Sequence, residues 1–183
     1  MPTTVAQGFA ELLSRIPATD AVTDKLKRHR ESIKACLASK FSMTNFVAAG
    51  SFGHGTNIPQ FSDVDYFMVQ DEDDWPNNSA TALRNVKNAL ANRFAFTDVR
   101  VSSPVVLVPF GQTSTERFEI TPAFFDDEDD EHEIFWIPDR ETGWMPSAPR
   151  AHNAYVTEVN QRLNGRVKPV IRLVKLWNGV CAV

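Results

Sequence analysis

Two helical patterns open the chain. Apolar residues recur at intervals of four, three and four residues from Val5 to Ile16, which predicts an amphipathic helix that Pro17 ends. A second apolar stripe, from Val22 to Leu37, predicts a longer helix. The rest of that helix carries five cations: Lys25, Lys27, Arg28, Arg30 and Lys34. A charged helix face of this kind is usually solvated.

The middle of the chain has the short apolar runs of a buried sheet. Residues 46–49, 63–69 and 117–122 are predicted strands, and residues 99–108 form a long strand broken at Pro104. Antiparallel pairing is expected between this long strand and the one that follows it. Together with the helices, these strands predict an α+β fold.

Two further helices are predicted between and after the strands. Ser79 is the expected N-cap of a helix that runs to Phe94. His152 and Asn153 are expected to precede another helix, which Gly165 ends as a C-cap.

The last helical pattern covers residues 167–178. Pro169 falls in its first turn, where a missing N–H costs nothing. Four apolar residues are expected to form its buried stripe: Val170, Ile171, Val174 and Trp177. Three cations lie along or beside that stripe, Lys168, Arg172 and Lys175, and periodicity alone indicates a solvated basic face.

Two segments lack a regular pattern. Residues 126–133 hold seven acids and one histidine, a self-repelling run that is typical of a solvated loop, with a metal site at His132 as the alternative. Residues 138–149 are rich in turn formers. Trp144 and Met145 are expected to pack there as an anchor, with contact to a nucleobase as the alternative.

Composition narrows the classes of function. The chain has 183 residues, 43% of them hydrophobic, which suffices for one domain with a core. Its net charge of −4 disfavours binding along a long nucleic-acid template, which depends on Lys and Arg. Cys36 and Cys181 show no metal-binding or redox spacing. Because no apolar run has membrane length and no signal-peptide pattern is present, a cytoplasmic, membrane-free protein is expected.

The candidate chemistry lies between two predicted strands. Residues 50–56, Gly-Ser-Phe-Gly-His-Gly-Thr, are called the glycine turn here, and the strand that follows opens with Asp63 and Asp65. Alternate residues of a strand share a face, so these carboxylates are expected roughly 6–7 Å apart. Two acids on one face repel each other unless a cation lies between them, and such oxygen ligands suit Mg²⁺ or Mn²⁺ held against phosphates.

The glycine turn has the residues of a phosphate-binding loop. Its glycines let backbone N–H groups approach an anion, and Ser51 and Thr56 carry hydroxyls that can donate to phosphate oxygens. A Walker A loop is excluded because the turn has no lysine, and a dinucleotide fingerprint needs another glycine spacing. A surface hairpin is the alternative for the turn taken alone, but the Asp-x-Asp strand beside it argues against that alternative.

The sequence GSFGHGT followed by SDVDYFMV resembles the GSxxxGT and SDxD signature of the DNA polymerase β-like nucleotidyltransferases. It is most similar to that of the bacterial cGAS/DncV-like nucleotidyltransferases (CD-NTases, SMODS). The resemblance implies a polymerase β-like fold, in which helices flank a mixed, mostly antiparallel, twisted sheet. It also implies the synthesis of cyclic di- or trinucleotide second messengers from NTPs in anti-phage defence (CBASS), with release of pyrophosphate.

The resemblance assigns the acids. Asp63, Asp65 and Glu119 match the three positions that bind two Mg²⁺ or Mn²⁺ ions, although aspartate is commoner than glutamate at the third position. Strand alternation alone leaves an outward-facing, solvated Glu119 equally open.

The resemblance also assigns residues to the nucleotide. Gly50, Ser51 and Thr56 match the phosphate-binding turn. The sequence over residues 171–177 resembles a helix whose lysine, two residues before a tryptophan, contacts the donor triphosphate, which assigns that role to Lys175.

The resemblance extends to organisation and partners. Residues 1–183 are expected to be the catalytic core with N-terminal helices and the start of a helical lobe, the remainder of which is absent or truncated. The implied substrates are ATP, GTP or other NTPs, and a regulatory protein or RNA is a possible further partner. The alternatives are another nucleotidyltransferase, which moves AMP or another NMP to an antibiotic, a protein or an RNA end, and an inactive nucleotide-binding relative.

Overall fold

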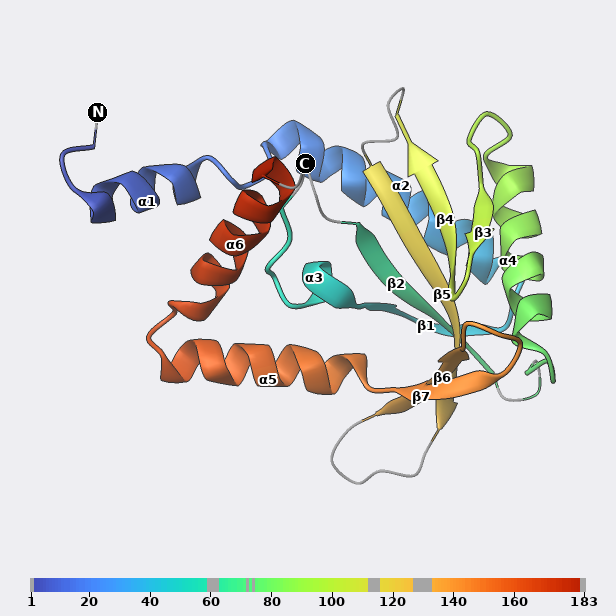
Figure 1. Ribbon diagram of the computed structural model, residues 1–183. Coiled ribbons are helices and arrows are strands. Elements are labelled where there is room, and N and C mark those ends of the chain that lie inside the picture. The colour runs from blue at the N-terminus through green and yellow to red at the C-terminus, as the bar shows by residue number, and fades with distance from the viewer. Residues whose placement is uncertain are drawn as a thin grey trace.

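The computed structural model describes residues 2–58, 63–71, 73, 75–111, 116–126 and 133–181. Helices surround a central sheet (Figure 1). The helices are α1 (Val5–Ser14), α2 (Asp20–Ala38), α3 (Gly50–Gly53), α4 (Ser79–Arg93), α5 (Pro149–Arg162) and α6 (Val167–Cys181). The strands are β1 (Met43–Ala48), β2 (Val64–Gln70), β3 (Arg100–Ser102), β4 (Val105–Phe110), β5 (Glu116–Asp126), β6 (Ile134–Pro138) and β7 (Trp144–Ser147). The α+β prediction is confirmed.

The centre of the sheet is a parallel pair, β2 and β5, in the strand order β1-β2-β5-β4-β3. The other pairs are antiparallel, so the sheet is mixed and mostly antiparallel, as expected. The break that was predicted at Pro104 within residues 99–108 is confirmed. The two parts do not continue in one direction, because β3 and β4 form an antiparallel hairpin through a turn at Ser103 and Pro104.

The two faces of the sheet have different surroundings. Val64, Tyr66 and Met68 of β2 point into the main core, which α2 and α4 complete. Because side chains alternate along a strand, Asp65 and Phe67 point to the other face, where Phe67 joins a smaller apolar cluster. This alternation leaves one face of β2 free for polar chemistry.

The first two predicted helices are confirmed as α1 and α2. The solvated face expected for α2 is confirmed for Lys27, Arg28 and Lys34. It is wrong for Lys25 and Arg30, which are half-buried. The Nζ of Lys25 lies 2.5 Å from Oε1 of Glu116, and the Arg30 guanidinium lies 5.4 Å from the centre of the Tyr66 ring. These cations join α2 to the sheet.

Two predicted helix starts are wrong by a few residues. Asn78, not Ser79, is the N-cap of α4, since its Oδ1 accepts the N–H of Ala80 at 2.9 Å. Helix α5 begins at Pro149, a residue favoured at the first helical position, so His152 and Asn153 are its fourth and fifth residues and do not precede it. The C-cap of α5 is Leu163, two residues before the predicted Gly165. Gly165 follows with a positive φ of 76°, and its N–H donates to the carbonyl of Asn160 at 2.7 Å.

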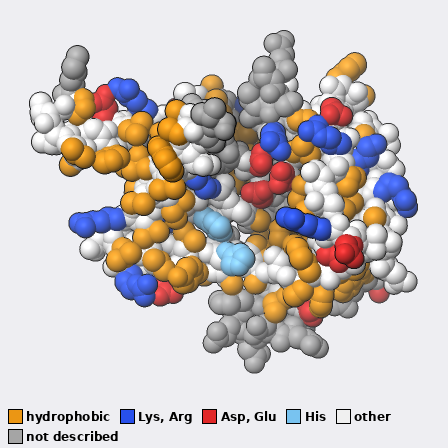
Figure 2. Space-filling view, in the orientation of Figure 1, with side chains coloured by type: hydrophobic (Ala, Val, Ile, Leu, Met, Phe, Trp, Pro, Cys, Tyr) orange, Lys and Arg blue, Asp and Glu red, His pale blue; other side chains and the backbone are white. Residues whose placement is uncertain are grey.

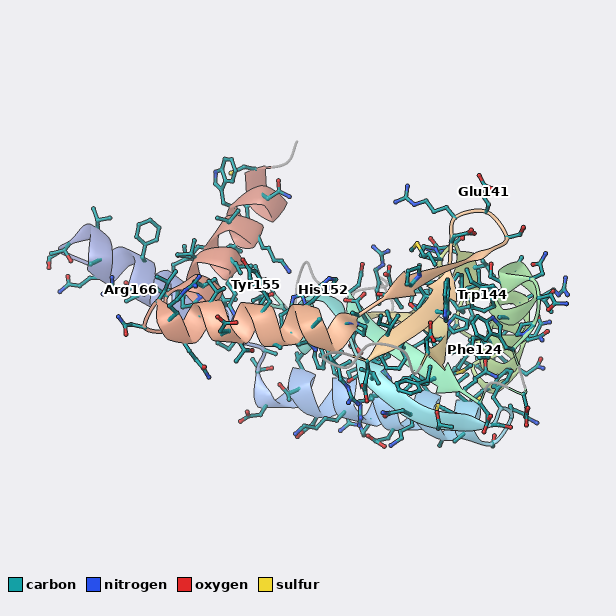
Figure 3. The ribbon with its side chains drawn as sticks, turned by 90° about the horizontal axis from the view of Figure 1, so that it is seen from below. Phe124, Glu141, Trp144, His152, Tyr155 and Arg166 are labelled. Carbon is teal, nitrogen blue, oxygen red and sulfur yellow. The ribbon has the colours of Figure 1, made fainter. Side chains whose placement is uncertain are left out.

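The segment over residues 138–149 contains a strand, β7, that was not predicted from its turn-rich composition. β6 and β7 form a hairpin there, and β6 also pairs with the end of β5. The predicted anchor is confirmed for Trp144, whose ring packs edge-on against Phe124 with centroids 5.1 Å apart (Figure 3). Its indole N–H donates to the carbonyl of Pro76 at 3.2 Å.

The stripe of α6 that was expected to be buried is wrong for three of its four residues. Val170, Val174 and Trp177 are 56%, 56% and 66% exposed, and only Ile171 is half-buried. Helix α6 contacts α5, α1 and the glycine turn, and none of these elements covers its apolar side. The amphipathic pattern was real, but periodicity does not show which neighbour covers a face.

Most of the acidic run, residues 127–132, lies outside the described residues, so the solvated-loop prediction and its His132 alternative stay predictions. None of the helices in the described part of the chain combines the length and apolar character that crossing a membrane requires.

Candidate active site

The parallel pairing of β2 and β5 brings acidic residues together. Asp65 and Glu119 are direct neighbours in the register of the two strands, and Asp63 lies one residue before β2. These three carboxylates are called the acid cluster below. Arg117 borders it, with Nε 3.3 Å from Oδ1 of Asp63 and Nη2 3.8 Å from Oε1 of Glu119. One guanidinium therefore pairs with two of the three acids.

The acids destabilise one another's ionised forms. The pKa of Asp65 is raised to about 6 by burial and then by the charge of Asp63, while Lys175 acts in the opposite direction. The pKa of Glu119 is raised to about 7 by burial and then by Asp63 and Asp65, against the influence of Arg117. Because an added cation favours the ionised carboxylates, the cluster is electrostatically prepared to bind one.

The glycine turn is a short helix, α3, rather than an irregular loop. It begins directly after β1, and its first N–H groups, those of Gly50 and Ser51, have no partner within the helix. The turn closes when the N–H of Thr56 donates to the carbonyl of Ser51 at 2.9 Å. It thus presents a compact end to the neighbouring strand.

Gly50 fixes the turn against the acid cluster. Its φ is +54°, and a Cβ on this residue would lie 2.0 Å from Oδ2 and 2.7 Å from Cγ of Asp65. The N–H of Ala49 donates to the carbonyl of Asp65 at 2.9 Å. Only glycine accommodates both this conformation and this contact.

Lysines of α6 lie on the other side of the turn. Lys175 is partly buried, which lowers its pKa, while the nearby charge of Asp65 raises it. The Nζ of Lys168 lies 3.5 Å from Oγ1 of Thr157 on α5, and 3.8 Å from where a Cβ of Gly55 would stand. Positive charge therefore faces the acid cluster across the glycine turn.

Two histidines, His54 and His152, border this positive side. Burial lowers the pKa of His54, in the glycine turn, and His152, Lys175 and Lys168 lower it further. His152 lies at the end of α5 nearest the sheet (Figure 3). Figure 2 shows histidine and carboxylate side chains together in a hollow at the centre of this face. Anions such as phosphates are attracted to this side, and metal cations to the acids.

The helices that carry this positive side are held against the turn. The Nη2 of Arg172 donates to the carbonyl of Gly55 at 2.6 Å. A Cβ on Gly53 would come within 3.0 Å of the Asn153 amide, so α5 and the turn are in close contact.

The donors of the acid cluster suit a divalent cation in charge and ligand type. Three carboxylates with two raised pKa values are hard oxygen ligands, so Asp63, Asp65 and Glu119 are the residues that could hold Mg²⁺ or Mn²⁺. As they stand, however, no three His, Cys, Asp or Glu side chains among the described residues are grouped closely enough to hold an ion.

The structure brings most of the predicted site residues together: Gly50, Ser51, Asp63, Asp65, Glu119 and Lys175. Thr56 differs, because it is only 2% exposed and lies at the base of the turn. Its phosphate contact stays a prediction, as do the roles of the others.

Sequence reasoning gave no role in this site to five residues that border it: His54, Arg117, His152, Lys168 and Arg172. A signal existed for α6, since Lys168, Arg172 and Lys175 are spaced four and three residues apart and share a helix face. No such signal joins α5 to the turn, since that contact depends on the tertiary fold.

A glycine turn beside a strand-borne acid cluster, on a mixed sheet of this order, is the arrangement that the sequence resemblance implies. Residues 3–160 match the family model described as the Second Messenger Oligonucleotide or Dinucleotide Synthetase domain, SMODS. The chain belongs to this family, which confirms the resemblance to the CD-NTases.

Two curated relatives are cyclic nucleotide synthases. A cyclic AMP-AMP-AMP synthase of Acinetobacter is 27% identical over 95% of this chain and 52% of its own length. A probable cyclic nucleotide synthase of Bacillus cereus is 28% identical over 67% of this chain and 37% of its own. The chain thus spans about half or less of the length of these relatives.

Solved structures of CD-NTases share the fold. The cyclic dinucleotide synthase CdnE of Elizabethkingia meningoseptica, solved with GTP and Apcpp, has a TM-score of 0.73 at 24% identity, over 96% of this chain and 66% of its own. Escherichia coli DncV, solved with 3′-deoxy GTP, has a TM-score of 0.70 at 13% identity, over 91% of this chain and 64% of its own.

Removing one charge from the acid cluster should change how stability depends on pH. A carboxyl whose pKa is raised on folding keeps its proton in the native state after the unfolded state has lost it, so stability falls as pH rises between the two pKa values. For Asp65 this window runs from its ordinary value of 3.8 to about 6. Asp65→Asn should match the wild type near pH 4 and exceed it by about 1–2 kcal/mol at pH 7.5.

The measurement is calorimetric unfolding in EDTA from pH 4 to pH 8. Asp98→Asn, which removes an exposed ion pair with Arg100, is the control. The free energy of unfolding of this variant should depend on pH in the same way as that of the wild type. A constant difference between Asp65→Asn and wild type across this range would contradict the raised pKa.

Adding a methyl group at Gly50 should displace Asp65. Gly50→Ala is expected to weaken Mn²⁺ binding, followed by electron paramagnetic resonance, by about 10-fold or more, since a carboxylate ligand must move. Gly165→Ala is the matched control: its φ of 76° brings similar backbone strain, of about 1 kcal/mol, but no atom lies within 4 Å of the added Cβ. Equal Mn²⁺ affinity in the two variants would show that the Gly50 contact does not position the acid.

Proposed function

We propose that this chain is the catalytic core of a nucleotidyltransferase that joins NTPs into cyclic oligonucleotide second messengers. The observation that carries the proposal is the convergence of the acid cluster, the glycine turn and Lys175 in one hollow of a SMODS-family chain. Opposite charges lie on its two sides, which suits a metal-bound triphosphate.

The glycine turn and α6 bind the triphosphate in this proposal. The first N–H groups of α3 and the Ser51 hydroxyl donate to phosphate oxygens. Lys175 supplies positive charge next to Asp65, and it stabilises the charge that builds on the departing pyrophosphate. Thr56 supports the turn from below.

The acid cluster organises the reacting groups. Two bound Mg²⁺ or Mn²⁺ ions would lower the pKa of the attacking ribose hydroxyl and neutralise the leaving group. Asp63, Asp65 and Glu119 would hold these ions. Arg117 then has fewer free carboxylates to pair with, because its two ion-pair partners belong to the cluster. Catalysis consists of positioning and electrostatics.

The proposal extends to organisation and setting. Residues 1–183 hold the core and the beginning of a helical lobe, and the lobe completes the site for the second nucleotide. ATP, GTP or other NTPs are the substrates, the setting is anti-phage defence in the cytoplasm, and a regulatory protein or RNA controls synthesis. In support, GTP and Apcpp occupy the related CdnE, and an Escherichia coli CdnC has been solved in complex with a HORMA protein.

The test is product formation by wild type and by Asp63→Asn. Radiolabelled ATP, GTP, CTP and UTP are incubated with the protein and Mn²⁺, and phosphatase treatment then leaves label only in cyclic or internally linked products. Asp63→Asn should lower product at least about 100-fold, because a metal ligand is lost. Its melting temperature should not fall, because the half-exposed ion pair with Arg117 contributes little and the loss of the Asp63 charge relieves its repulsion of Asp65 and Glu119.

Asp98→Asn is the control for charge removal and should retain full activity. Label that phosphatase removes completely would contradict the proposal. Transfer of AMP to an added antibiotic, protein or RNA end would indicate another nucleotidyltransferase. ATP binding without any product, lost in Lys175→Ala, would indicate an inactive nucleotide-binding relative.

A further inference from the structure

Arg117 borders the acid cluster but has no part in the reaction proposed above. It lies two residues before Glu119 on β5, so the two side chains point to the same face of the strand. The parallel register sets Asp65 beside Glu119. Two residues earlier along both segments, Nε of Arg117 lies 3.3 Å from Oδ1 of Asp63. An acid–acid neighbour pair is therefore followed, on one face of the sheet, by an acid–guanidinium pair.

The guanidinium is placed where the acid cluster lacks positive charge. Its Nη2 also lies 3.8 Å from Oε1 of Glu119, so both ion pairs that the cluster forms within the described part of the chain are with Arg117. Lys175 acts on Asp65 instead, from the side of the glycine turn. Figure 2 shows Lys or Arg side chains next to the carboxylates of the central hollow. The two outer acids thus depend on one arginine for their counter-charge.

The contacts of Arg117 are loose. Charge-assisted N–H···O bonds are typically about 2.7–2.9 Å long, and both distances here exceed that range. The Arg117 side chain is 47% exposed, and those of Asp63 and Glu119 are 34% and 25% exposed. Ion pairs with this degree of exposure contribute little to stability. The guanidinium is close enough to repel another cation, yet it can leave at small cost.

A divalent cation and this guanidinium compete for the same oxygens. Mg²⁺ binds carboxylate oxygens at about 2.0–2.1 Å, and an arginine that still paired with those oxygens would lie within a few ångströms of the ion and repel it. In their present positions, no three side chains of ligand type within the described ranges are grouped closely enough for an ion. Metal entry therefore requires Asp63 and Glu119 to turn from the guanidinium toward the ion.

We propose that Arg117 is an internal counter-ion of the acid cluster, which a divalent cation must displace from Asp63 and Glu119 in order to bind. The guanidinium lowers the affinity of the site for the metal and neutralises the acids until the metal arrives. Arg117 acts through the acids and is therefore a positioning residue. This inference rests on the metal-binding part of the proposed function and is independent of the product.

Mn²⁺ binding without nucleotide, followed by electron paramagnetic resonance at pH 7.5, tests the competition. Arg117→Met removes the charge without adding an oxygen ligand, and it should bind Mn²⁺ about 10-fold tighter than the wild type. Arg117→Lys retains the charge and should stay within about 3-fold of the wild type. Arg100→Met, at an exposed ion pair with Asp98, is the matched control for the loss of one positive charge and should leave the affinity unchanged. Arg117→Gln serves if Arg117→Met fails to fold.

Nuclear magnetic resonance of the arginine side chains tests the displacement itself. The Nε–H signal of Arg117 is assigned by its loss in Arg117→Met. Saturating Mg²⁺ should make this N–H exchange with water about 3-fold faster or more than in EDTA, because it no longer lies against a carboxylate. The exchange rate of the Arg100 Nε–H, whose partner is outside the cluster, should not change.

Mn²⁺ affinity that is equal or weaker in Arg117→Met would overturn the proposal, because the guanidinium would then be indifferent to the metal or would help to place its ligands. Equal tightening in Arg100→Met, or an Arg117 exchange rate that Mg²⁺ leaves unaltered, would overturn it as well. Asp65→Asn separates these failures from failure of the proposed function. If that variant loses Mn²⁺ affinity, the acids bind the metal whatever Arg117 does. If it binds Mn²⁺ as the wild type does, the metal site itself is wrong, and the counter-ion role with it.

Discussion

The parallel pairing of β2 with β5 is the constraint on which the site depends. This register sets Asp65 beside Glu119, and strand alternation keeps both off the main core that Tyr66 and Phe118 enter. Like charges in direct register oppose sheet formation. Apolar neighbours on the other face hold the strands in this register, so the repulsion persists and appears as raised pKa values. The free energy of the core thus maintains an arrangement of charges that would not form by itself.

The glycine turn lies against one of these carboxylates. Gly50 places the backbone directly against the carboxylate of Asp65, closer than any other residue type would allow. Phosphates bound by the turn would therefore lie within a few ångströms of whatever cation the acids hold. The phosphate-attracting turn and the cation-attracting acid cluster form one site because Gly50 has no side chain to separate them.

Much of this site could be predicted from the sequence. Asp63 and Asp65 are two residues apart at the start of a strand, and the turn lies shortly before them in the chain, so local rules suffice. Glu119 needed the resemblance, because nothing local shows that its strand pairs with β2. The contacts of Arg172 and Asn153 with the turn arise between segments about one hundred residues apart, and no periodicity encodes them. The hairpin of β6 and β7 was missed for another reason: its prolines and turn formers outweighed its aromatic residues.

Helix α6 shows why burial was harder to predict than helicity. Its apolar stripe has the right period, yet Val174 and Trp177 face outward. Much of what positions the helix is instead polar, including the Arg172 bond to the turn and the Lys168 contact with Thr157. Lys175 belongs to the same helix, so groups that bind Arg172 or cover the apolar stripe would also set the position of the lysine that faces Asp65.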